Sequence, residues 1–352
     1  MEHNKALIAM SGGVDSSVAA WLMRQAGYNC AGANLRMWDA DGTGVADARA
    51  VAQRLGMEFH ALEAGEEFRQ RVVDGFICAY EQGLTPNPCF ECNRTMKFGF
   101  LLDRALELGY DLVVTGHYAR IRRDETSGRY GLYKAADSAK DQTYFLACLT
   151  QHQLAHAAFP LGELTKEQVR TIAEEQCFIT ARKRDSQDIC FVPDGDYVRF
   201  MKEYTGKNYP AGDFLDLAGK VVGRHSGAVG YTLGQRKGLG IALGAPVYVC
   251  AKDMEQNTVT VGPNEALYAT TLRANNWNFM PFPALTEPMR VMAKARYRHA
   301  EQPATVYPEA DGFARVVFDE PQRAMTPGQA VVLYDGDMVV GSGTITEIIE
   351  NA

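Results

Sequence analysis

Three cysteines stand out as residues that could do chemistry. Cys89 and Cys92 form a C-x-x-C, and Cys190 follows the basic residues Lys183 and Arg184. A cysteine beside a helix start or beside basic side chains gains thiolate character, and the thiolate is the reactive form. A lone C-x-x-C suits a redox pair, half of a zinc site or part of an iron–sulfur site. No second C-x-x-C in the sequence completes a four-cysteine zinc site.

A second kind of chemistry is indicated by the hexapeptide Ser-Gly-Gly-Val-Asp-Ser at 11–16. Glycine lets the backbone approach a ligand closely, and the unpaired amides at a helix start attract anions. The hexapeptide lacks the lysine of the common nucleoside-triphosphate loop. It resembles instead the pyrophosphate loop of ATP-pyrophosphatases, which implies that AMP, not phosphate, is transferred to a substrate.

Hydrophobic periodicity predicts the elements that must position these residues. Strands are predicted over Lys5–Met10, Asn29–Leu35, Met57–Leu62 and Asp111–Thr115, and helices over Ser17–Ala26, Val45–Leu55, Phe98–Leu108, Asp141–Leu149 and Thr165–Glu175. This order indicates an α/β fold with a parallel sheet. Ligands bind at the carboxyl ends of such strands, so the loops that begin at Ser11 and Gly116 are expected to share one pocket. Pro86 and Pro88 predict an extended, rigid loop through the C-x-x-C, followed by a helix from about Arg94.

Composition and charge restrict the class of protein. The chain has 352 residues, of which 46% are hydrophobic and 22% charged, as in a globular protein of two or three domains. The net charge of −7 argues against non-specific binding to nucleic acid, while clusters such as Lys294–His299 leave room for a local basic surface. No apolar run is long enough to span a bilayer and no signal peptide is recognisable, which predicts a cytoplasmic protein with reduced thiols.

The residue composition and the hydrophobic pattern change twice along the chain. Glycines become frequent after about Tyr204, and alternating strand patterns with tight turns follow after about Tyr268. We therefore expect three domains: a parallel-sheet, nucleotide-binding α/β domain over 1–203, a small β-rich domain over 204–267 and a C-terminal β-barrel over 268–352.

Six segments occur in the order in which tRNA-specific 2-thiouridylases carry their motifs. They are 9–16, 85–88 with Cys92 and Asn93, 115–120, 139–146, 185–191 and 230–238. Together with 296–297 and 326–329, they make the chain similar to this family along nearly its whole length. The resemblance implies an ATP- and Mg²⁺-dependent tRNA sulfurtransferase that adenylates C2 of the wobble uridine and gives 2-thiouridine. A persulfide or sulfide donor protein would supply the sulfur.

The resemblance also implies roles for individual residues. ATP would be bound by Ala9, Met10, Ser11, Gly12, Gly13, Val14, Asp15, Ser16, Leu35 and Gly116. The target base would meet Asn87, Pro88 and Cys89, and the rest of the tRNA would meet His117, Lys140, Asp141, Gln142, Arg296, Tyr297 and Gln329. The catalytic set would be Cys190, as carrier of the persulfide, with Cys92, Cys89 and Asp15.

Two positions depart from the family pattern. Leu35 stands where Met is common, a mild change for an apolar contact with adenine, and Cys89 stands where many members have Asp. The extra thiol leaves two mechanisms open. One is a persulfide relay that ends in a Cys92–Cys190 disulfide, and the other is a 4Fe–4S cluster on Cys89, Cys92 and Cys190 with one iron open for sulfide. Two other functions also stay open: an ATP-pyrophosphatase synthetase for a small molecule, and a non-catalytic, tRNA-binding iron–sulfur protein.

Overall fold

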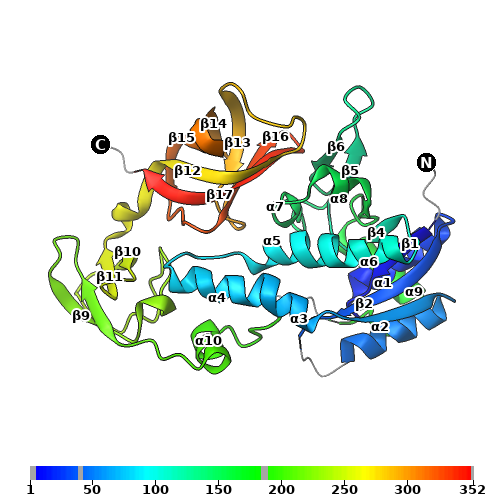
Figure 1. Ribbon diagram of the computed structural model, residues 1–352, viewed down its shortest axis with the longest axis horizontal. Coiled ribbons are helices and arrows are strands. Elements are labelled where there is room, and N and C mark those ends of the chain that lie inside the picture. The colour runs from blue at the N-terminus through cyan, green and yellow to red at the C-terminus, as the bar shows by residue number, and fades with distance from the viewer. Residues whose placement is uncertain (1–4, 39–42, 184–188, 350–352) are drawn as a thin grey trace.

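The computed structural model describes residues 5–38, 43–183 and 189–349, which contain three sheets (Figure 1). The first sheet is parallel, with the strand order β3-β2-β1-β4-β7. Its strands are β1 (Lys5–Ala9), β2 (Asn29–Arg36), β3 (Glu58–Glu63), β4 (Leu112–Val114) and β7 (Ala157–Ala158). The predicted α/β fold with a parallel sheet is thereby confirmed, with β7 as an additional edge strand.

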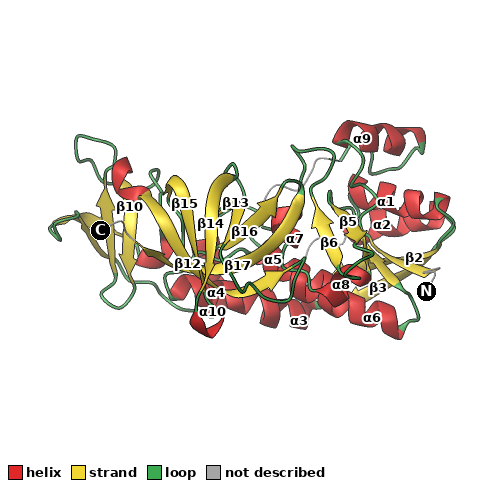
Figure 2. Cartoon of the chain, turned by 90° about the horizontal axis from the view of Figure 1, so that it is seen from above, coloured by secondary structure: helices red, strands yellow, loops and turns green. Residues whose placement is uncertain are grey.

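Helices cover both faces of this sheet because its central strand is apolar on both sides. Leu7 of β1 packs in the core that contains Phe98 and Leu101, whereas Ala6 and Ile8 pack in the core that contains α1, α2 and α9. Figure 2 shows the same arrangement, with α1, α2 and α9 on one side of the sheet and α6 on the other. The bounds of these helices are α1 (Val14–Gln25), α2 (Thr43–Arg54), α6 (Leu101–Glu107) and α9 (Lys166–Glu175).

The C-x-x-C lies in a helix, so the predicted extended loop is wrong. Helix α5 (Pro88–Cys92) continues through the π-helical segment η2 (Asn93–Phe100) into α6. Asn87 is the N-cap, and its side-chain oxygen accepts a hydrogen bond from the amide of Phe90 at 3.3 Å. Proline is well tolerated at the first helical position, which is where Pro88 lies. The cap and the proline together start the helix about six residues earlier than the sequence predicted.

The helix predicted over Asp141–Leu149 is also largely wrong. Only α7 (Thr143–Leu146) is helical there, and α8 (Gln151–Ala155) follows as a separate helix. Leu146, Ala147 and Leu149 are all fully buried, so the apolar residues have no single face from which a helical period could be recognised. Other helices of the first 205 residues are α3 (Gly65–Phe68), η1 (Arg69–Val73), α4 (Asp74–Glu81) and α10 (Tyr197–Thr205).

The remaining two sheets belong to the β-rich part of the chain. The four-stranded sheet contains β8 (Gly212–Leu215), β9 (Val221–His225), β10 (Tyr248–Asp253) and β11 (Thr258–Gly262). The third sheet contains β12 (Tyr268–Phe279), β13 (Met289–Lys294), β14 (Gln302–Pro308), β15 (Ala314–Arg323), β16 (Ala330–Asp335) and β17 (Met338–Ile349). Because β12 pairs with both β15 and β17, these strands close into the predicted antiparallel barrel. Three short 3-10 turns complete the region: Ala228–Gly230, Asn264–Leu267 and Ala310–Gly312.

A hairpin that the sequence analysis did not predict joins the first part of the chain to the barrel. Its strands, β5 (Arg120–Arg123) and β6 (Tyr130–Tyr133), extend the barrel sheet through the pairing of Tyr133 with Met338. None of the described helices is both long enough and apolar enough to cross a membrane.

Candidate functional site

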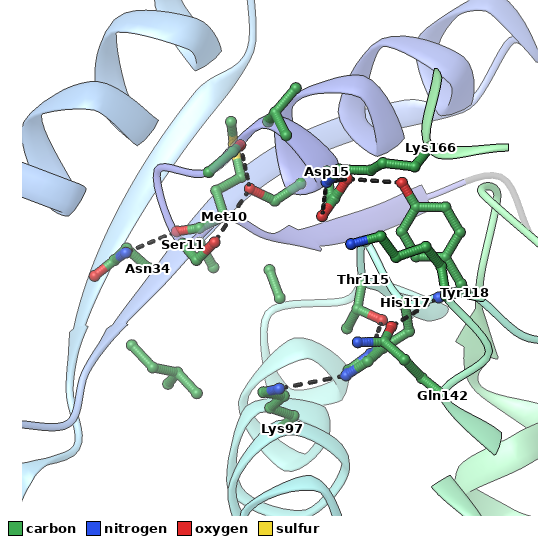
Figure 3. A pocket seen from close by; sticks show the side chains of 18 of the residues that line it. Met10, Ser11, Asp15, Asn34, Lys97, Thr115, His117, Tyr118, Gln142 and Lys166 are labelled. Carbon is green, nitrogen blue, oxygen red and sulfur yellow. Dashed lines mark hydrogen bonds and ion pairs between the residues drawn. The ribbon is translucent and has the colours of Figure 1, made fainter. Parts of the chain in front are cut away.

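A cavity of about 510 Å³ lies at the carboxyl end of β1, a volume typical of small-ligand sites (Figure 3). It is lined by loops and helices from distant parts of the chain: Ala9, Met10, Ser11, Gly13, Val14, Asp15, Ser16, Ala33, Asn34, Leu35, Met37, Lys97, Thr115, Gly116, His117, Tyr118, Ala139, Lys140, Gln142, Lys166 and Tyr297. The two loops that were expected to share a pocket, at Ser11 and at Gly116, therefore do so.

The hexapeptide forms a tight cradle at the start of α1. Gly12 has φ +76°, and a Cβ atom there would lie 2.3 Å from the carbonyl oxygen of Gly44, so only glycine fits. Gly13 is the N-cap of α1 and has no side chain with which to cap the first amides. These amides and the positive end of the helix dipole favour a bound anion. Lys183 adds a cation at the loop, because its Nζ donates to the carbonyl of Gly12 at 3.1 Å.

Asp15 provides the carboxylate of the cavity. Lys166 Nζ donates to its two oxygens at 2.7 and 2.8 Å, and the Tyr118 hydroxyl donates to it at 2.8 Å (Figure 3). The loop of Gly116 lies directly against it: a Cβ atom on Gly116 would be 2.7 Å from both the carbonyl carbon of Asp15 and the amide nitrogen of Ser16. The cavity thus combines the amides at the start of α1, three lysines (Lys97, Lys140 and Lys166) and one carboxylate, which suits a polyphosphate and its counter-ion.

His117 is a neutral side chain at the floor of the cavity and is only 9% exposed. Burial, and then the positive charge of Lys97, hold the pKa of His117 well below its usual value. The Nε2 atom lies 3.4 Å from Lys97 Nζ, which can only donate, so Nε2 accepts. The proton is therefore on Nδ1, which donates to the hydroxyl of Thr115 at 2.6 Å.

The low pKa of His117 makes the stability of the protein depend on pH. The unfolded chain binds a proton below about pH 6.5 while the folded chain does not, so the contribution of His117 is present above pH 6.5 and lost as the pH falls toward the folded-state pKa. We expect the difference in free energy of unfolding between wild type and His117→Gln to shrink by about 1.4 kcal/mol per pH unit below pH 6.5. Urea denaturation at several pH values measures it, with His60→Gln as the matched control. Parallel curves for wild type and His117→Gln would contradict it.

The three cysteines do not line this cavity, but Lys97, which does line it, acts electrostatically on all three. Desolvation raises the pKa of Cys89, Cys92 and Cys190, to about 11 for Cys92, while the charge of Lys97 acts in the opposite direction at all three. Each thiol is also within electrostatic range of at least one of the others. Cys190 lines a second cavity of about 500 Å³, which shares Ser11 and Leu35 with the first. Arg184 and the motif residues 185–188 lie outside the described residues.

The cysteines as they stand do not fit a metal cluster. Within the described ranges, no group of three His, Cys, Asp or Glu side chains is arranged to hold a metal ion. Desolvation at the three sulfur atoms instead favours the neutral thiols over the thiolates.

Comparisons of the sequence with known proteins identify the family of this chain. The family model of the "tRNA methyl transferase HUP domain" matches residues 4–194, and those of the "tRNA methyl transferase PRC-barrel domain" and the "Aminomethyltransferase beta-barrel domain" match 198–263 and 269–345. The tRNA-specific 2-thiouridylase MnmA of Acetivibrio thermocellus is 48% identical over 98% of this chain and 100% of its own. The one of Moorella thermoacetica is also 48% identical, with the same coverage of both chains. The chain belongs to the tRNA-specific 2-thiouridylase family.

Among solved structures, the U34-tRNA thiolase NcsA from Methanococcus maripaludis with its 4Fe–4S cluster is similar at 17% identity. The match covers 58% of this 2-thiouridylase chain and 68% of that chain, with a TM-score of 0.36.

Within the 2-thiouridylase site, the residues attributed to the base and to the tRNA fall into two groups. His117, Lys140, Gln142 and Tyr297 line the main cavity. Tyr297 is 37% exposed at its rim and packs against Phe145 with ring centroids 4.3 Å apart. These side chains share the cavity with the 11–16 loop.

The second group holds the 2-thiouridylase fold together. Gln329 Nε2 donates to the carbonyls of Thr85 and Pro86 at 2.7 and 3.3 Å. Arg296 donates to the carbonyl of Leu233 at 3.0 Å and to the hydroxyl of Thr326. Asn87 caps α5. Gln329 and Asn87 thus brace the segment that leads into the C-x-x-C, whereas Arg296 joins the barrel turn at Thr326 to Leu233.

Asp141 is separated from the main cavity of the 2-thiouridylase. Its carboxylate accepts hydrogen bonds from the amide of Ala135 at 3.0 Å and the hydroxyl of Thr143 at 2.6 Å, and it lines a neighbouring cavity of about 810 Å³. Burial raises the pKa of this carboxyl group. In this structure Asp141 organises the 135–143 loop that carries Lys140 and Gln142.

The sequence analysis assigned no role to five polar residues that line the cavity: Asn34, Lys97, Thr115, Tyr118 and Lys166. Thr115 and Tyr118 lie within the motif segment 115–120, and Lys166 is the first residue of α9, after the N-cap Thr165. Lys97 carries no sequence signal because its place opposite His117 depends on the π-helical segment η2.

Proposed function

We propose that this chain is an ATP-dependent tRNA sulfurtransferase that converts the wobble uridine to 2-thiouridine. The observation that carries the proposal is the contact between two cavities: one contains the phosphate loop, and the other, which shares Ser11 and Leu35 with it, is lined by Cys190. Membership of the 2-thiouridylase family, at 48% identity over nearly the full chain, supports the same activity.

In the first half-reaction, ATP would lie with its phosphates on the amides of the 11–16 loop. Lys166 and Lys183 would balance the phosphate charge, and Asp15 is the carboxylate that would hold Mg²⁺. Ala33 and Leu35 offer an apolar wall for the adenine. The C2 oxygen of uracil attacks the α-phosphorus of ATP and pyrophosphate leaves. The C2 oxygen, a poor leaving group by itself, can then leave as part of AMP.

In the second half-reaction, a persulfide on Cys190 attacks C2 through its terminal sulfur. The new C–S bond forms as the C–O bond breaks, and AMP leaves with the electron pair. The Cys92 thiolate then attacks the Cys190 sulfur, which releases 2-thiouridine and leaves a Cys92–Cys190 disulfide for an external reductant. Because the pKa of Cys92 is raised to about 11, this step requires that its proton be removed in the complex.

The tRNA would be held by all three parts of the chain. We propose the division 1–203, 204–267 and 268–352, with Asn87, Pro88 and Cys89 against a base extruded from the anticodon loop. His117, Lys140, Gln142 and Tyr297 support this placement because they line the cavity. Arg296 and Gln329 would reach the tRNA only by releasing their present partners. A cytoplasmic persulfide donor protein completes the proposal.

The test is mass spectrometry of tRNA nucleosides after incubation with ATP, Mg²⁺ and a sulfur source. A persulfide donor and inorganic sulfide are supplied in separate reactions. We expect 2-thiouridine with the persulfide donor and none when ATP is omitted. Absence of 2-thiouridine under both conditions would contradict the proposed activity and favour a synthetase that acts on a small molecule.

Iron analysis separates the two sulfur carriers. Protein purified without oxygen is assayed for iron and acid-labile sulfide and tested for activity in parallel. Full activity without iron supports the persulfide relay, whereas activity that requires about four irons per chain would support the 4Fe–4S alternative on Cys89, Cys92 and Cys190.

A further inference from the structure

One cation of the cavity lies within electrostatic range of all three cysteines. Lys97 lines the cavity from η2, five residues after Cys92. In a π-helix the hydrogen bonds join residues five apart, so such residues lie nearly above one another. The π-helical segment therefore brings Lys97 to the side of the helix that carries Cys92. In Figure 3 Lys97 extends from this helix toward His117.

Lys97 has no carboxylate partner among the residues that the structure describes. Its Nζ contacts the neutral imidazole of His117 at 3.4 Å, and that ring is fixed on its other side by Thr115. No carboxylate of the described residues forms an ion pair with Lys97. By contrast, Lys166 pairs with Asp15 and Lys183 pairs with Asp47. The ammonium group of Lys97 thus meets a neutral ring and not a carboxylate.

The positive charge of Lys97 acts on the sulfur atoms of the three cysteines. Lys97 acts electrostatically on Cys89, Cys92 and Cys190, and at each it favours the sulfur anion over the neutral thiol. In the proposed reaction a sulfur anion attacks C2, and its negative charge disappears as the C–S bond forms and AMP leaves. A fixed cation is therefore needed before and during the attack, not in adenylation.

We propose that Lys97 is the counter-ion that holds the attacking sulfur anion at the cavity, and that it serves sulfur transfer and not adenylation. Lys97 acts through the sulfur atoms, so it is a positioning residue. This inference rests on the proposed function and adds to it a residue that is required for only one of the two half-reactions.

The first experiment compares Lys97→Met and Lys97→Arg with wild type in two assays of single turnover. Lys97→Met should lower 2-thiouridine formation by about 10- to 100-fold and leave tRNA-dependent pyrophosphate release within about threefold. Lys97→Arg, which keeps the charge, should recover at least part of the loss. Arg104→Met, which removes an exposed cation from the same helical run, is the control and should change neither assay. Equal loss of both activities in Lys97→Met, or no rescue by arginine, would overturn the proposal.

The second experiment needs no tRNA and so remains informative if the proposed function fails. Cys89 and Cys190 are exposed, so their alkylation can be followed by mass spectrometry. The ratio of the rates with anionic iodoacetate and neutral iodoacetamide reports the local positive charge, because the thiolate fraction cancels. In Lys97→Met this ratio should fall about fivefold at low ionic strength, while Lys97→Arg should keep it. An unchanged ratio in Lys97→Met would show that the ammonium does not act on the sulfur atoms and would overturn the proposal.

Discussion

Replacing Cys190 by serine is expected to lower 2-thiouridine formation by about 1,000-fold or more, with tRNA-dependent pyrophosphate release within about threefold of wild type. A hydroxyl group cannot carry the transferable sulfur, so the second half-reaction has no nucleophile. In the proposed scheme the first half-reaction depends on the 11–16 loop, Asp15 and Lys166, which the substitution does not touch. Nucleoside mass spectrometry and a coupled pyrophosphate assay measure the two halves separately.

The matched control for this substitution is Cys78→Ser. Cys78 is an exposed cysteine of α4 whose sulfur contacts only the side chain of Gln82 among the described hydrogen bonds. Cys78→Ser should retain both activities. Appreciable 2-thiouridine formation by Cys190→Ser would show that another thiol carries the sulfur. Loss of both 2-thiouridine formation and pyrophosphate release would indicate a structural role for Cys190.

Gly116→Ala is expected to act on the opposite half of the reaction, with a loss of about 100-fold in tRNA-dependent pyrophosphate release. The added methyl group would lie 2.7 Å from the backbone of Asp15 and Ser16, and backbone atoms cannot swing aside as a flexible side chain can. The first turn of α1 must therefore shift, and the phosphates lose their alignment. The rate of pyrophosphate release at saturating ATP measures the effect.

Gly75→Ala is the control for the added methyl group. Gly75 lies in α4, and a Cβ atom there would meet nothing within 4 Å, so activity should be unchanged and the helix slightly stabilised. Alkylation of Cys190 should be the same in Gly116→Ala and wild type, because the sulfur side of the site is not displaced. Normal pyrophosphate release by Gly116→Ala would mean that the loop tolerates the shift and that the close approach has no role in ATP binding.

Local sequence signals were sufficient for the nucleotide half of the site. The loop at 11–16 lies between a strand and a helix whose apolar residues have clear periods, and both predicted elements are present. The barrel strands were predicted for the same reason, since their alternation matches the pleat of a half-buried sheet. The Cys89–Cys92 helix was missed because two prolines favour an extended loop unless one of them occupies the first helical position.

The parts of the site that the sequence could not predict depend on contacts between distant segments. Lys97 contacts His117 from the π-helical segment η2, and hydrophobic periodicity alone does not indicate that winding. Lys166 meets Asp15 across 151 residues of chain, through the packing of α9 on α1. Strand β7 is two residues long, too short for any period to be recognised.

The hydrogen bond between Gln329 and Thr85 joins residues that are 244 positions apart in the chain. During synthesis on the ribosome, the α/β part emerges well before the barrel turn that holds the segment leading into Cys89 and Cys92. Contacts of such long range form late in folding. The nascent polypeptide would therefore acquire its phosphate loop early and its fully ordered cysteine helix late, so that a partly made enzyme could bind ATP before its thiols were in place.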